Sequence, residues 1–263
     1  MNKYFTYIYI IAKNSYSTKK KLIFQMLNHI IFLLFNFFLY QNLYKIKPEL
    51  VDKIPFQNAI WSMSMYFVIF WLGTRRLSRI FKGDIESGNI EIYLLRPMNY
   101  IKQKVLQITG QNIYPFLLAL ITSVVISFYL VGLPVIYGNK YFFLIQLFVI
   151  LIFSQILMYL LYIFCGLIAF WMNDNTPIEN LFGKFIMILG GAWVPVAFFP
   201  LVIQKVAYYS PFGVSASLSL AMYPDSISSF NRNMFVIMFW IIVFGLINYF
   251  TYKLAVKKIS VNG

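Results

Sequence analysis

The sequence predicts an all-α integral membrane protein with six transmembrane helices, forming a single domain over residues 1–263. Six stretches of about twenty apolar residues run through the chain, none with an acidic or basic residue in its middle, and a helix of roughly 20 apolar residues crosses a bilayer. Hydrophobic residues make up 60% of the chain and charged residues 11%, against about a quarter charged in soluble domains. This composition excludes an ordinary soluble protein.

The basic residues alternate between the two sides of the predicted helices. They are frequent in segments 3–21, 75–104 and 253–258, and sparse around residues 45–53, 140, 205 and 232. Because cytoplasmic loops carry the excess of lysine and arginine, this distribution predicts that both termini are cytoplasmic. The net charge of +14 then follows from topology, and anionic lipid head groups rather than nucleic acid are its expected partners.

Residues 1–21 precede the first predicted span. Within them, residues 4–12 read YFTYIYIIA, which is apolar but too short to cross a membrane, and no small-residue cleavage site follows. A secretory signal peptide would need such a site. We therefore expect an uncleaved elbow helix lying at the membrane interface, with a loosely ordered tail as the alternative.

The predicted spans cover residues 22–44, 56–74, 106–136, 141–172, 182–204 and 234–253. The fifth is the least regular, because segment 182–224 is interrupted by glycines and by prolines, which remove a helical hydrogen bond. A seventh span at 206–222 would place the basic tail outside, against the charge bias. We therefore expect the fifth helix to break near Gly190–Pro195 and segment 190–224 to form re-entrant or outer-surface helices lining protein or a water-filled cavity.

The longest polar insertion lies in segment 78–98, and residues 83–100 read GDIESGNIEIYLLRPMNY. Ile85, Ile92 and Leu95 fall on a helical repeat that Pro97 ends, which predicts an amphipathic helix. Such a helix is either a solvated loop helix on the membrane or a docking surface for a cytosolic partner.

Catalysis by this chain is poorly supported. No G-x-x-x-x-G-K-[ST] phosphate loop occurs, so we expect no ATP hydrolysis here. The one histidine, His29, and the one cysteine, Cys165, cannot form a zinc site, and we expect no metal or cofactor bound by this chain. We expect His29 to be a buried polar residue bonded to a neighbouring helix, with a gating or substrate role as the alternative.

Four segments together resemble type-2 ABC exporter permeases. ESGNIEIYLLRPMNY at 86–100 resembles the cytoplasmic motif of that family, a G-x-[ILV]-x-x-[YL]-LL-R-P core after the second span. FCGLIAFW at 164–171 is similar to the end of its fourth span, GGAWVPVAFFP at 190–200 to the break of its fifth, and the terminal KKISVNG to the basic tail of one branch. The terminal Asn-Gly and the MNDNTP exit of the fourth span depart from the pattern.

The resemblance implies an exporter permease in the bacterial plasma membrane. It implies a second six-span permease, identical or different, and separate cytosolic ATPase subunits that bind ATP and Mg²⁺. It also implies that segment 78–98 is a coupling helix, which meets the ATPase through Glu86, Gly88, Glu91, Leu95, Arg96 and Pro97. We expect an extracellular gate shaped by Gly190, Gly191, Pro195, Phe199 and Pro200. The aromatic-rich spans suit an amphipathic or hydrophobic cargo.

Two other classes stay open at this point. An ion-coupled or facilitative carrier is disfavoured because such transporters usually keep ionisable residues inside the membrane. A membrane enzyme or non-catalytic scaffold is disfavoured because the chain lacks a catalytic constellation.

Overall fold

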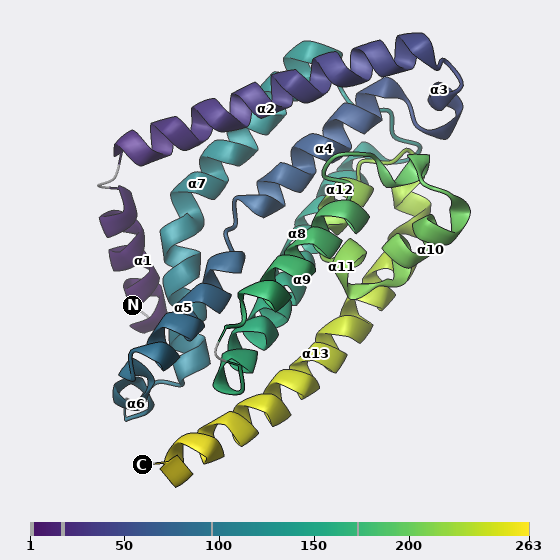
Figure 1. Cartoon of the computed structure of the whole chain (residues 1–263). Coiled ribbons are helices and arrows are strands. Elements are labelled where there is room, and N and C mark those ends of the chain that lie inside the picture. The colour runs from purple at the N-terminus through teal and green to yellow at the C-terminus, as the bar shows by residue number, and fades with distance from the viewer. Residues whose placement is uncertain (1–2, 17–18, 96, 173, 263) are drawn as a thin grey trace.

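The computed structural model describes residues 3–16, 19–95, 97–172 and 174–262, and all regular secondary structure within them is helical (Figure 1). The prediction of an all-α protein is confirmed. Four helical segments are long and apolar enough to cross a bilayer, and they correspond to the first, third, fourth and sixth predicted spans: Leu22–Ile46, Tyr100–Val131, Lys140–Phe170 and Ser226–Lys257.

The second and fifth predicted spans form shorter helices than expected. α4 (Phe56–Phe70) has 15 residues and α9 (Thr176–Leu189) has 14, whereas the sequence predicts helices over 56–74 and 182–204. At 1.5 Å per residue these helices measure roughly 21–23 Å, less than the ~30 Å of the hydrocarbon core. Both end at turns that contain a glycine with positive φ, Gly73 and Gly191.

A sharp corner separates α4 from α5 (Arg75–Glu86). Gly73 adopts a φ of +61°, which residues with a Cβ rarely occupy. A Cβ there would also lie 2.6 Å from the side-chain nitrogen of Asn112. Asn112 Nδ2 donates to the Leu72 carbonyl at 2.9 Å, so a side chain of α7 (Tyr100–Val131) satisfies a backbone group that the corner leaves without a helical partner.

α5 packs closely against α8 (Lys140–Leu167) at a glycine. Leu77 and Phe81 are fully buried on α5, and a Cβ on Gly166 would lie 2.7 Å from the Phe81 ring. Gly166 therefore permits a helix separation that a larger residue would prevent. α8 then ends in the short 3-10 helix η1 (Ile168–Phe170).

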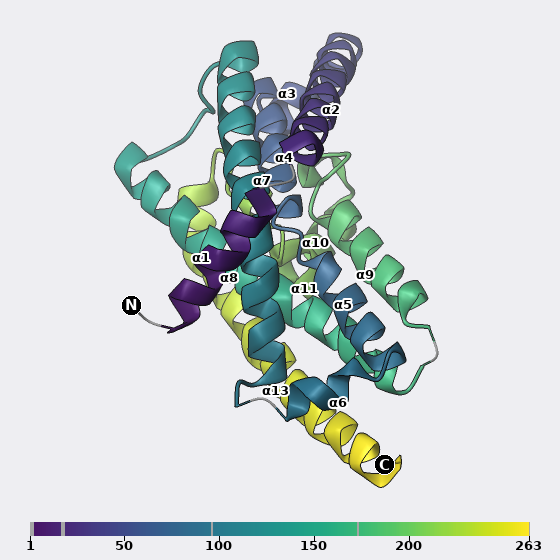
Figure 2. The ribbon, with the colours of Figure 1, turned by 90° about the vertical axis from the view of Figure 1, so that its left-hand side faces the viewer.

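α1 (Lys3–Tyr16) and α2 (Lys19–Ile46) both contact α7 (Figures 1 and 2). A Cβ on Gly110 would lie 3.0 Å from the Ile8 carbonyl oxygen, so this glycine lets α1 lie close to α7. α2 runs obliquely across α7 and α4 (Figure 1), and its exposed apolar side chains include Ile23, Phe24, Leu27, Ile31, Phe35 and Phe38. An exposed row of this kind suits a lipid environment.

α13 (Ser226–Asn262) lies beside α8 and completes the main hydrophobic core. Leu157 and Leu161 of α8 are fully buried there with Ile237 of α13. Asn248 Nδ2 on α13 donates to the Leu160 carbonyl at 2.8 Å. A polar side chain in an apolar span thus joins two helices, as expected for intramembrane packing.

Short helices connect α9 to α13, on the side of the bundle away from α6 (Asn89–Leu94) (Figure 1). They are η2 (Val196–Phe198), α10 (Leu201–Tyr209), α11 (Pro211–Val214) and α12 (Ser217–Leu220), with α3 (Leu50–Lys53) near them. Asn58 of α4 donates from Nδ2 to the Val135 and Met222 carbonyls at 2.7 and 2.6 Å, and its Oδ1 accepts from the Val135 N–H. One buried asparagine therefore links α4 to two connections.

His29 lies in a closed set of hydrogen bonds. The indole N–H of Trp71, which can only donate, points to His29 Nδ1 at 3.2 Å. Nε2 therefore carries the proton of the neutral ring and donates to Ser123 Oγ at 2.9 Å. The expected buried, hydrogen-bonded histidine is confirmed.

Candidate functional site

The predicted docking residues gather at one end of the bundle, on a turn of residues 86–97 that we call the α6 tip. α5 ends at Glu86, Gly88 turns the chain with a φ of +70°, and α6 follows. Five of the predicted docking residues are exposed there: Glu86, Gly88, Glu91, Leu95 and Pro97. Arg96 lies outside the described residues.

The α6 tip has one anchored face and one exposed face. Ile90 packs into a buried cluster with Leu77 and Phe81, whereas Leu95 is 88% exposed and Ile92 is 58% exposed. Apolar side chains held out from a short, anchored helix are suited to entering a groove on another protein.

A buried ion pair joins the end of α5, next to the α6 tip, to α7. Lys104 Nζ lies 2.7 Å from Asp84 Oδ2, and the two side chains are only 3% and 13% exposed. The Tyr100 hydroxyl donates to the same carboxylate oxygen at 2.8 Å, and Lys104 Nζ lies 3.6 Å from the centre of the Tyr93 ring. Because a satisfied buried polar network admits few alternative arrangements, it holds the tip rigidly. The sequence alone identified Asp84 and Lys104 only as loop charges.

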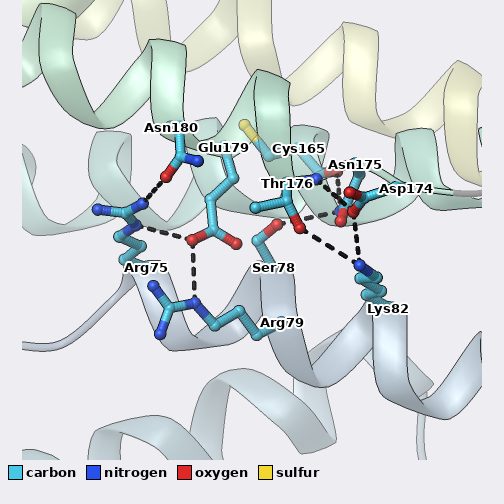
Figure 3. Close-up of polar contacts among 10 residues, drawn as sticks. All are labelled: Arg75, Ser78, Arg79, Lys82, Cys165, Asp174, Asn175, Thr176, Glu179 and Asn180. Carbon is cyan, nitrogen blue, oxygen red and sulfur yellow. Dashed lines mark hydrogen bonds and ion pairs between the residues drawn. The ribbon is translucent and has the colours of Figure 1, made fainter.

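A second polar network joins α5 to the first turn of α9 (Figure 3). The Glu179 side chain is 2% exposed, and its Oε1 accepts from Arg75 Nε at 2.7 Å and from Arg79 Nε at 3.0 Å. Arg75 Nη2 also donates to the side-chain oxygen of Asn180. Hydrogen bonds between ionised groups are stronger than those between neutral groups. A carboxylate in the first turn of a helix is also stabilised by the helix dipole. Sequence analysis did not identify Glu179.

The same region fixes the connection between α8 and α9 (Figure 3). Asn175 Nδ2 donates to the Cys165 carbonyl at 2.8 Å and to Ser78 Oγ at 3.2 Å. Lys82 Nζ lies 2.5 Å from Asp174 Oδ1, and the Lys82 ammonium holds the pKa of that carboxyl well below its usual range. In the sequence, the one signal of this connection was the polar MNDNTP exit of the fourth span, which departs from the family pattern.

A cavity of about 540 Å³ lies beside the Glu179 network. Ligand-binding cavities commonly measure ~300–1,000 Å³, so this volume suits a small molecule or part of a larger one. Its lining comes from α4, α5, α7, α8 and α9, with Ser15 of α1 and Leu22 and Gln25 of α2. Arg75 and Asn180 belong both to the lining and to the network, so a shift of α5 against α9 changes the shape of the cavity.

The predicted gate residues form a turn and two helix starts. α9 ends just before Gly190, where a Cβ would lie 2.5 Å from the Ala216 Cβ. Gly191 then turns the chain with a φ of +78°. Pro195 and Pro200 directly precede η2 and α10. The glycines therefore end the helix, and the prolines, with their fixed φ, lead into the next elements rather than kinking the first.

The four helices that are long and apolar enough to cross a bilayer indicate a multi-pass membrane protein. Residues 30–263 match the family described as ABC-2 family transporter protein, and the chain belongs to this family. Comparison with curated proteins finds no match. The family consists of membrane transport subunits of ABC transporters, generally non-catalytic, which work with an ABC ATPase. The resemblance to ABC-2-type permeases is confirmed.

Proposed function

We propose that this chain is the permease subunit of an ABC exporter, moving an amphipathic or hydrophobic cargo out of the cell with ATP hydrolysed by a separate cytosolic subunit. The observation that carries the proposal is the continuous link through α5. At one end of α5 stands the exposed α6 tip, and at the other stands Arg75, which lines the cavity and bonds Glu179. A helix of 12 residues is a rigid connection about 18 Å long.

In this proposal the α6 tip is the coupling segment. The ATPase contacts Leu95 and the carboxylates of Glu86 and Glu91. Its closure on ATP moves the tip, the Asp84–Lys104 pair transmits that movement to α7, and the arginines of α5 transmit it to α9 through Glu179. ATP and Mg²⁺ are bound by the partner, because this chain has no phosphate loop.

The proposal includes six membrane crossings with both termini in the cytoplasm. In this proposal α4 and the corner after it form the second crossing, and segment 190–224 completes the crossing that α9 begins. The arrangement is supported by the placement of α1, the α6 tip and the C-terminal end of α13 toward one end of the bundle (Figures 1 and 2). The segments of highest basic content lie at that end. Gly190, Gly191, Pro195, Phe199 and Pro200 would then form the extracellular gate.

A complete transporter in this proposal contains a second permease subunit, either another copy or a related chain, with the path between the two. This pairing comes from the family resemblance. The apolar face of α2 offers a surface within the bilayer that either lipid or a second subunit can cover.

Co-expression with the cognate ATPase and reconstitution into liposomes test the proposed function. We expect the ATPase to co-purify with the chain and an amphipathic fluorescent cargo to enter inside-out vesicles only when ATP is supplied. Uptake driven by a proton or sodium gradient without ATP would instead identify an ion-coupled carrier.

A further inference from the structure

We propose that the cavity beside Glu179 binds an amphiphile through an anionic head group of the phosphate type, with the attached apolar tail lying against the helices. That this amphiphile is the transported cargo rests on the function proposed above.

The charge of the cavity wall supports an anionic ligand. Its basic lining residues are Arg75, Arg76, Arg79 and Lys184, and its described lining includes no aspartate or glutamate. Glu179 bonds Arg75 and Arg79 and offsets one of these four charges. Arg76 and Lys184 are exposed and form no ion pair with a described carboxylate. A cleft lined by charge of one sign concentrates ligands of the opposite sign, and guanidinium groups match phosphate geometry.

The remaining lining supports an amphiphile rather than a free ion. Ile69, Phe70, Ile186 and Met187 contribute apolar surface, which an inorganic anion would leave uncovered. Gln111 also lines the cavity, and its buried Oε1 has no hydrogen-bond partner. Such an atom can accept a hydrogen bond from a hydroxyl on the head group, which offsets the cost of burying it unpaired.

The position of the cavity gives binding a consequence for coupling. A head group held by Arg75 and Arg79 shares these guanidinium groups with Glu179, the residue through which α5 holds α9. Competition for the same donors weakens that joint. Ligand binding therefore weakens the contact between α5 and α9, through which the α6 tip is connected to α9.

The test is the binding of dodecyl phosphate to the full chain in phosphatidylcholine nanodiscs, followed by calorimetry. Inorganic phosphate and dodecyltrimethylammonium are the comparison ligands. We expect both to bind more weakly than dodecyl phosphate by about tenfold or more, because only dodecyl phosphate combines charge-assisted hydrogen bonds with apolar burial. Adding phosphatidic acid to the nanodisc distinguishes the sources, since displacement by it identifies a membrane lipid as ligand and no displacement identifies a soluble amphiphile.

Two paired variants locate the site. Arg76→Gln with Lys184→Gln should weaken dodecyl phosphate binding by about tenfold, because two cations that attract the head group are lost. The matched control, Lys140→Gln with Lys205→Gln, removes two exposed lysines outside the cavity and should bind normally. Gly183→Leu should also abolish binding by filling the cavity, since a Cβ there already approaches Arg75 Nη1 to 3.4 Å.

Equal binding of dodecyl phosphate and dodecyltrimethylammonium, or unchanged binding by the Arg76→Gln and Lys184→Gln variant, overturns the inference. Equal binding of inorganic phosphate overturns the role of the tail. Co-purification of the ATPase is measured on the same samples. ATPase association without selective binding rejects the anionic ligand and leaves the proposed function standing, whereas selective binding without ATPase association rejects the proposed function and leaves the site.

Discussion

Arg75 Nε lies 2.7 Å from Glu179 Oε1, although the two residues are 104 positions apart in the chain. The carboxylate is 2% exposed, whereas the Arg75 side chain is 36% exposed, so the acid is buried and the base reaches it from the cavity wall. Arg79, four residues further along α5, bonds the same oxygen. Two arginines of α5 therefore bind one carboxylate of α9, and we call this contact the joint between α5 and α9.

Replacing Glu179, the acid of this joint, should prevent the cargo from stimulating ATP hydrolysis. We expect Glu179→Gln to insert, fold and bind the ATPase, yet lose cargo-stimulated ATP hydrolysis in proteoliposomes. The cost in stability should be only about 1–2 kcal/mol, because both arginines remain partly solvated. Asp174→Asn is the matched control, since it removes an exposed carboxylate from a pair on the same connection. Normal stimulation in Glu179→Gln would show that the joint does not transmit coupling.

The buried pair beneath the α6 tip should be important for stability. Lys104→Met leaves the Asp84 carboxylate without its ion-pair partner, and breaking a buried pair on one side typically costs ~3–5 kcal/mol. We expect a large fall in the thermal unfolding temperature of the detergent-solubilised chain. The double variant Asp84→Leu with Lys104→Met should recover part of that loss, because no unpaired charge remains. A double variant as unstable as the sum of the two single variants would contradict a direct interaction.

The exposed face of the α6 tip should bind the ATPase. Leu95→Asp should weaken binding by ~2 kcal/mol or more if this leucine is a central contact. Glu86→Lys and Glu91→Lys should also weaken it wherever the carboxylate faces a basic residue of the ATPase. The measurement is co-purification of the ATPase at equal membrane expression.

Lys102→Glu is the control for the tip variants. Lys102 Nζ lies 3.8 Å from the centre of the Tyr4 ring, so this residue contacts α1 rather than the exposed tip. We expect Lys102→Glu to alter the packing of α1 and leave docking largely intact. Full recovery of the ATPase with all three tip variants would place the docking surface elsewhere, such as on the connection between α8 and α9.

Reporter fusions should distinguish six crossings from other counts. Fusions after residues 48, 139 and 228 should report an extracellular position, and fusions after residues 84, 176 and 260 a cytoplasmic one. The critical position is 228, because a cytoplasmic signal there would mean that segment 206–222 crosses the membrane and that the short helices α10 to α12 do not remain on one side.

Within the proposed gate, replacing Gly191 should reduce stability more than replacing Pro195 or Pro200. Gly191→Ala places a Cβ on a residue with a φ of +78°, which costs roughly 1–2 kcal/mol, and it should reduce both stability and transport. Pro195→Ala and Pro200→Ala change residues that precede short helices, so they should assemble normally. If these residues shape a gate, the two proline variants should transport cargo at altered rates. Normal transport by both would limit the prolines to a structural role.

Local patterns determined the class of this protein. The length of the apolar stretches predicted the all-helical membrane fold and its four longest helices. The glycine and proline positions predicted that the fifth helix breaks near Gly190–Pro195. These features depend on a few neighbouring residues, since bilayer thickness fixes helix length and backbone sterics fix where a helix can end. The resemblance of residues 86–97 to a family motif marked the segment that forms the α6 tip.

The tertiary structure alone decided which charges are buried and which residues meet. Neither Lys104 nor Glu179 was distinguished in the sequence from other loop charges, yet each is buried because a partner on another helix satisfies it. The cavity likewise joins side chains from helices spread over the first 187 residues. Such contacts follow from how helices pack, at Gly110 and Gly166 for example, and packing depends on the shapes of both surfaces together. The residue pattern within a single segment therefore does not predict which residues meet.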